Sequence, residues 1–109
     1  MLPSTLREKK HYLSVEIVSE EEISENDVRQ EILDSCRSFL GLLEFARAGI
    51  SIISSRKSGK KFSLVLVTDR KYVTKVRAAL ILISEVNGKK VMIQTKGVSG
   101  TLKRLRQKF

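Results

Sequence analysis

The sequence predicts an α+β fold with the element order β-α-β-β-α-β, in which two helices cover one face of a four-stranded antiparallel sheet. Apolar and polar residues alternate with the period of a strand in residues 11–18 and 61–67. Apolar residues recur with the period of a helix in residues 28–43 and 73–83. A chain of 109 residues is long enough for one core of two packed layers, and its 41% hydrophobic and 30% charged residues are typical of a folded protein.

The first predicted helix has a clear start and an apolar stripe. Ser24 followed by Asp27 predicts the start, because the hydroxyl can accept a hydrogen bond from a free backbone N–H and the carboxylate can answer it. The stripe residues share helical spacing; they are Val28, Ile32, Cys36, Phe39, Leu40 and Leu43. Gly41 is expected to end or kink this helix, and residues 42–48 then form a short extra helix closed by Gly49.

A hairpin is expected near the middle of the chain. Residues 50–55 are rich in β-branched side chains, and residues 61–67 alternate again, so both segments are predicted to be strands. Residues 56–60 form the connecting loop, in which Gly59 supplies the tight turn.

A long helix and a last strand are expected to follow the hairpin. Thr68 or Asp69 caps the helix, which runs to about Val86 and is stopped by Asn87-Gly88. Its core stripe shares helical spacing and consists of Val73, Val76, Leu80 and Ile83. Residues 89–96 form the last strand.

The whole chain, residues 1–109, is expected to form a single domain. Residues 1–10 have no clear period and are predicted to be an N-terminal arm, residues 11–98 an α/β sandwich, and residues 99–109 a basic tail. This element order is that of the ferredoxin-like fold, which the RNA recognition motif shares.

The sequence lacks the aromatic residues on which an RNA recognition motif stacks bases. That module needs aromatics on its two central strands. Residues 60–67 have the basic start and a single Phe, Phe62, and only 6% of the chain is aromatic, with no Trp. We therefore expect recognition of phosphates and of shape.

The sheet face away from the helices is expected to be half apolar. Its candidate partner-facing residues are Tyr12, Val65, Val67 and Met92, which stand among polar neighbours. Such an exposed face is typical of a partner surface. The alternative is that the short helix at 42–48 or the tail folds over it.

The charge is divided unevenly along the chain. The net charge is +9, but residues 1–50 hold 6 Lys+Arg against 10 Asp+Glu, whereas residues 51–109 hold 15 against 2. A directional positive field attracts polyanions, chiefly nucleic acid. An anionic membrane is a weaker alternative, because no long basic amphipathic helix or lipid signal is evident. The longest apolar run, residues 78–83, is far shorter than a membrane span, so a soluble intracellular protein is expected.

The sequence offers no catalytic or metal-binding constellation. One Cys and one His exclude an internal disulfide and leave too few ligands for a zinc cage. Cys36 falls on the apolar stripe, and after residue 50 only Asp69 and Glu85 are acidic. The acidic cluster, which starts at Glu20, is explained by a helix start better than by a magnesium site or a docking patch.

Basic residues occur in clusters, as binding to a phosphate backbone requires. The candidate RNA-binding residues outside the tail are Arg7, Lys9, Lys10, Arg56, Lys57, Lys60 and Lys61, and Lys89 and Lys90 form a further basic pair. The basic residues of the long helix, residues 70–77, are expected to be its solvated face.

The start of the tail is the most specific local pattern. Its candidate RNA-binding residues are Gly97, Ser99, Gly100, Thr101, Lys103 and Arg104. Ser99 or Thr101 can cap a helix that starts near Leu102, and free N–H groups beside Lys103 and Arg104 would make an anion site. The alternative is a strand-exit turn with a loose basic tail.

Four blocks of the sequence together resemble a known family. They are residues 2–10 (LPSTLREKK), 76–80 (VRAAL), 84–89 (SEVNGK) and 97–104 (GVSGTLKR). They resemble the archaeal ribonuclease P protein component 2 family, related to a small protein subunit of eukaryotic ribonuclease P and MRP. The resemblance covers essentially the whole chain in order.

The resemblance implies a non-catalytic subunit of an RNA-based endonuclease that removes the 5′ leader from precursor tRNA. It implies that the ribonuclease P RNA holds the magnesium and does the chemistry, with no cofactor in the protein. It also implies pairing with ribonuclease P protein component 3, and we expect a cytoplasmic protein that can self-associate. The alternatives are a general or ribosome-associated RNA-binding protein, a small-ligand regulatory domain of the same topology, and an autonomous nuclease.

Overall fold

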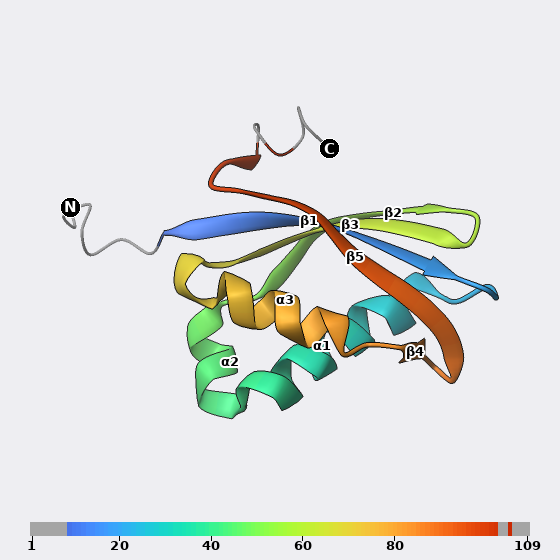
Figure 1. The fold of residues 1–109 in the computed structure, drawn as a ribbon, viewed down its shortest axis with the longest axis horizontal. Coiled ribbons are helices and arrows are strands. Elements are labelled where there is room, and N and C mark those ends of the chain that lie inside the picture. The colour runs from blue at the N-terminus through green and yellow to red at the C-terminus, as the bar shows by residue number, and fades with distance from the viewer. Residues whose placement is uncertain (1–8, 103–104, 106–109) are drawn as a thin grey trace.

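The computed structural model describes residues 9–102 and residue 105, and its main elements follow the predicted order (Figure 1). In chain order they are β1 (Lys10–Ser19), α1 (Glu25–Leu40), α2 (Leu42–Ala48), β2 (Ser51–Ser58), β3 (Lys61–Asp69), the 3₁₀ helix η2 (Arg70–Tyr72), α3 (Val73–Ile81), β4 (Glu85–Val86) and β5 (Lys89–Ser99). The predicted α+β class is confirmed.

The strands form one curled antiparallel sheet in the order β2-β3-β1-β5-β4. The predicted number of four strands is wrong, because the two-residue β4 adds a fifth, with Glu85 opposite Lys90. The order of the four longer strands is compatible with a ferredoxin-like sheet. Figure 1 shows α1, α2 and α3 on one side of the sheet, so the other side is left without a helix.

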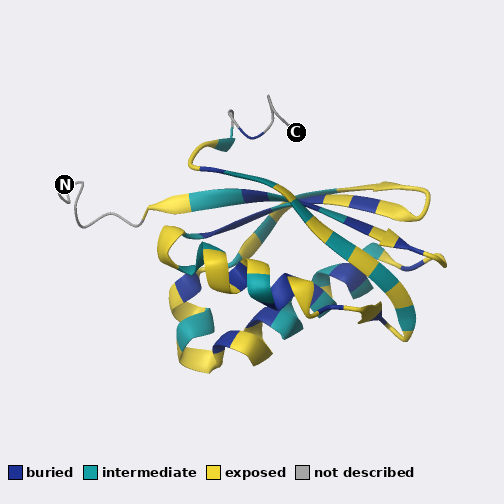
Figure 2. Cartoon of the chain, viewed as in Figure 1, coloured by how far each residue is buried: buried dark blue, intermediate teal, exposed yellow. Residues whose placement is uncertain are grey.

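The central strand β1 carries the middle of the core. Its residues Leu13, Val15 and Ile17 are each 0% exposed, because they point from the sheet toward the helices. On the neighbouring strand β3, Phe62 and Leu64 lie in the same buried cluster. Figure 2 shows how buried and exposed residues alternate along the strands, as the period-two pattern predicts.

Helix α1 begins where the sequence predicts. Ser24 is its N-cap, and the Ser24 hydroxyl accepts a hydrogen bond of 3.1 Å from the N–H of Asp27. The stripe is buried at every fourth residue from Val28 to Leu40, but Phe39 is 45% exposed because it lies beside this row. Leu43 is also outside the core: Gly41 has a φ of 82° and starts a new helix, α2, which breaks the phase of the stripe.

The long second helix is shorter than predicted. It ends at Ile81 rather than near Val86, and the chain continues into β4. Asn87 and Gly88 have positive φ values of 53° and 78°, and they form the tight turn of a β4–β5 hairpin. A two-residue turn of this kind needs a paired strand on each side, and Val86 is buried there.

The strands around the predicted loops are longer than expected. β2 runs to Ser58, which reduces the predicted loop at 56–60 to Gly59 and Lys60. β5 runs to Ser99, and its register against β1 shifts between Ser14 and Val15.

Replacing Ser24 with Ala should lower the free energy of unfolding by about 1 kcal/mol, because the N–H of Asp27 loses its acceptor at the start of α1. Chemical denaturation followed by circular dichroism measures this change. The control is Ser38→Ala on the exposed side of the same helix, expected within about 0.5 kcal/mol of the natural protein. Equal stability of the two variants would contradict the capping role.

Candidate nucleic-acid interface

One end of the sheet gathers three basic segments, on the side where the chain enters β1 (Figure 1). The N–H of Arg70 donates to the carbonyl of Lys9 at 2.7 Å, which joins the entry to β1 with η2. The hydroxyl of Thr68 donates to the carbonyl of Ala48 at 2.9 Å, which joins the end of β3 to the end of α2. These contacts place segments far apart in the sequence side by side.

We call this end of the molecule the basic end. Its cations are all exposed; they are Lys9, Lys10, Arg47, Arg70 and Lys71. Asp69, the carboxylate of these segments, accepts a hydrogen bond from the backbone N–H of Lys71 at 2.9 Å. Close positive charges from separate segments raise the local anion concentration, which is what capture of a phosphate backbone needs. Sequence reasoning missed the contribution of Arg47, Arg70 and Lys71, which only the tertiary fold joins to β1.

The start of the tail also approaches the basic end. A Cβ atom placed on Gly100 would lie 3.6 Å from Nε2 of His11, so glycine suits this close passage over β1. Gly97 lies opposite Ser14 in β5, and Ser99 is buried with its hydroxyl accepting from the N–H of Thr101 at 3.2 Å. That N–H is therefore already paired and does not await an anion.

The predicted basic cluster of the β2–β3 hairpin is divided between the two faces of the sheet. Lys57 lies on the helix side, where its Nζ donates to the carbonyl of Ile23 at 3.4 Å and stands over the Phe62 ring. Lys61 lies on the open side and pairs with Glu16 at 3.1 Å. Alternation along a strand forces this division.

The remaining predicted RNA-binding residues fall into two groups. Arg56 and Lys60 are exposed, and within the described part of the chain neither forms an ion pair. Arg7, Lys103 and Arg104 lie outside the described residues. The structure therefore does not test the predicted anion site beside Leu102.

The opposite end of the sheet has mixed charge. Nζ of Lys89 donates to the carbonyl of Glu22 at 2.8 Å, and Nδ2 of Asn87 donates to the Asp27 carboxylate at 3.3 Å. The acidic residues here thus hold the β4–β5 hairpin against the start of α1. This end is a poor candidate for binding a polyanion, because carboxylates offset its lysines.

The acidic side chain of Glu25 has a structural role. The hydroxyl of Ser55 donates to its carboxylate and holds the pKa of Glu25 below its ordinary value, and Arg29 at 3.3 Å acts in the same direction. These contacts tie α1 to β2. Among the described residues, no group of three or more His, Cys, Asp or Glu side chains could hold a metal ion.

The open sheet face is partly covered and partly exposed. Tyr12 and Val65 are half-buried, Val67 is 7% exposed, and Met92 is 66% exposed. Leu105 of the tail is buried and lines a cleft on this face together with Val65, so the tail and not α2 covers this part of the sheet. The predicted partner face is therefore narrower than the alternation suggests.

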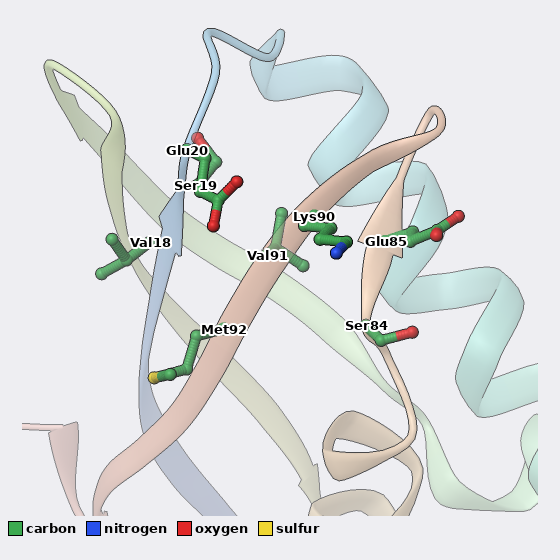
Figure 3. A pocket seen from close by; sticks show the side chains of 8 residues that line it. All are labelled: Val18, Ser19, Glu20, Ser84, Glu85, Lys90, Val91 and Met92. Carbon is green, nitrogen blue, oxygen red and sulfur yellow. The ribbon is translucent and has the colours of Figure 1, made fainter.

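Met92 belongs to a separate apolar groove at the far end of the sheet (Figure 3). The groove has a volume of about 520 Å³, and its lining residues come from β1, β4 and β5 and their flanks: Val18, Ser19, Glu20, Ser84, Glu85, Lys90, Val91 and Met92. Val18 lies opposite Met92 across the β1–β5 pair. Sequence reasoning missed Val18, although its place among the outward residues of β1 was the available signal.

The described residues provide no nucleophile. Cys36 is fully buried, and burial raises the pKa of its thiol to about 11, so the thiol stays protonated at neutral pH. This agrees with its predicted place in the core. In the described part of the chain, no helix is long and apolar enough to cross a membrane.

Known proteins resemble this chain over nearly its full length. A sequence profile of the Rpp14/Pop5 family matches residues 11–109. The chain belongs to the Rpp14/Pop5 family. It is 40% identical to ribonuclease P protein component 2 of Thermococcus gammatolerans, over 99% of this chain and 88% of that protein.

Two further family members named ribonuclease P protein component 2 show the same extent of similarity. That of Pyrococcus abyssi is 40% identical over 99% of this chain and 90% of that protein. That of Methanosarcina mazei is 36% identical over 100% of this chain and 90% of that protein. The resemblance to this archaeal family, stated above from four sequence blocks, is thereby confirmed.

Replacing Arg70 and Lys71 together with Gln should weaken RNA binding and reduce the salt dependence of the binding constant by about one logarithmic unit per lost phosphate contact. Filter binding across a salt series measures both quantities. The matched control is the double variant Arg37→Gln/Lys75→Gln, which removes the same charge from side chains already paired with Asp34 and Glu44. An equal fall in both double variants would show that only net charge matters.

Proposed function

We infer that this chain is a protein subunit of ribonuclease P that has no catalytic site of its own. The observation that carries this inference is its similarity over essentially the whole chain to archaeal proteins named ribonuclease P protein component 2. The chemistry of the described residues agrees: exposed cations gather at one end, and the single thiol is protonated in the core. The general or ribosome-associated RNA-binding protein is not favoured.

The proposed role of the protein is electrostatic. The cations of the basic end reduce the repulsion between phosphates where RNA segments crowd together, which stabilises the folded RNA. The RNA subunit, with its own magnesium, would cut the 5′ leader from precursor tRNA. The magnesium is thus assigned to the RNA and not to this chain.

The finer assignments are also proposals. The partners are ribonuclease P RNA, precursor tRNA, ribonuclease P protein component 3 and a second copy of the chain, and the compartment is the cytoplasm. The face offered to component 3 is the exposed remainder of the open sheet face, with Met92, while Tyr12 and Val65 contribute less surface. The ferredoxin-like assignment of the sheet belongs here too, supported by its strand order.

Cleavage of precursor tRNA by the cognate ribonuclease P RNA at limiting magnesium tests the function. We expect the RNA alone to be slow, and this protein together with component 3 to restore the rate, because the added cations replace part of the magnesium requirement. The protein without RNA should not cleave.

Each other outcome of this assay has a definite meaning. Cleavage by the protein without RNA would contradict a non-catalytic subunit. Tight RNA binding with no stimulation by the protein pair would contradict membership of this complex and would point to another RNA-binding role.

A further inference from the structure

The open face of the sheet contains a cleft of about 390 Å³ beneath the tail. Its lining residues come from three adjacent strands and the tail: Ser14, Ser54, Ser55, Arg56, Ser63, Leu64, Val65 and Leu105. Leu105, which is 2% exposed, forms one wall. The cleft is at the lower end of the volumes usual for ligand sites, about 300–1,000 Å³.

The register of the strands explains why a hollow exists there. Val65 lies opposite Ser14 on one side and Ser54 on the other, and Ser63 lies opposite Arg56 in the next row. Three small serine side chains on neighbouring strands leave space above the sheet that larger residues would fill. The seat of Leu105 then turns this shallow surface into a cleft.

The polar groups of the cleft are unused. Within residues 9–102 and 105, the hydroxyls of Ser14, Ser54 and Ser63 have no hydrogen-bond partner, and Arg56 has no ion pair. Other serines of the chain are engaged: the Ser35 hydroxyl, for example, donates to the carbonyl of Ala79 at 2.9 Å.

The charge at the cleft comes from Arg56. The neighbouring Lys61 is compensated by Glu16 at 3.1 Å, so that pair contributes little net charge. A guanidinium is suited to a phosphate because its planar fork donates two parallel hydrogen bonds. No aromatic side chain lines the cleft, so stacking of a base is not provided for.

We propose that this cleft binds the sugar–phosphate backbone of a single-stranded RNA segment, with Arg56 on a phosphate and Ser14 and Ser63 on the ribose 2′-hydroxyl. A hydroxyl both donates and accepts, as recognition of a 2′-hydroxyl requires, and the 2′-hydroxyl distinguishes RNA from DNA. The proposal rests on the RNA-binding role inferred above and gives it a second site, separate from the basic end.

The test compares short single-stranded RNA and DNA oligonucleotides of the same mixed sequence, titrated against the full chain by fluorescence anisotropy. The natural protein is expected to bind the RNA more tightly. Ser14→Ala/Ser63→Ala should weaken RNA binding by about tenfold and leave DNA binding unchanged, because only the contacts to the 2′-hydroxyl are lost. Arg56→Gln should weaken both by about tenfold.

The matched control is Arg77→Gln, which removes one exposed, unpaired charge from α3 on the helix side of the sheet. It should change either affinity by less than about threefold. The proposal is overturned if Arg56→Gln behaves like Arg77→Gln, if the serine variant keeps the RNA preference, or if the oligonucleotide does not bind the natural protein. Circular dichroism confirms that each variant is folded.

Failure of this proposal is distinguishable from failure of the proposed function. If the natural protein with component 3 stimulates the ribonuclease P RNA but the cleft variants bind RNA normally, only the cleft assignment is wrong. If the natural protein gives no stimulation while the cleft variants lose RNA binding, the cleft stands and the ribonuclease P role is wrong.

Discussion

The burial of one face of β1 is the constraint on which the rest of the structure depends. Leu13, Val15 and Ile17 are fully buried between the sheet and the helices, and β1 is paired on both edges, with β3 and with β5. Because side chains alternate along a strand, a slip of one residue would exchange the two faces. The same constraint that builds the core therefore also fixes which residues stand on the open face and which segments meet at each end of β1.

The charge distribution follows from this arrangement. At one end of β1, Lys9 and Lys10 meet η2, whose Arg70 is bonded to the carbonyl of Lys9. At the other end, the chain turns through an acidic loop whose Glu22 carbonyl accepts from Lys89. A sequence with a surplus of cations in its second half thus becomes a molecule with a positive end and a mixed end, which gives an RNA partner a preferred orientation.

The local structure was largely predictable from the sequence, whereas the contacts between distant segments were not. The cap at Ser24 and the break at Gly41 depend on nearby residues, and both are found where predicted. The end of α3 was misjudged because Asn87-Gly88 fits both a helix stop and a hairpin turn, and the strand partner decides between them. The union of Lys9 with Arg70, and the seat of Leu105 on the sheet, depend on tertiary pairing that spacing alone does not reveal.

Hydrogen exchange of the full chain, free and bound to its cognate ribonuclease P RNA, tests most directly whether RNA meets the basic end. The account predicts that RNA slows exchange of backbone amides around Lys9–Lys10 and Arg70–Lys71, while those in the acidic loop at 20–22 and the β4–β5 hairpin stay unchanged. Protection confined to the hairpin and the acidic loop, with none at the basic end, would contradict it.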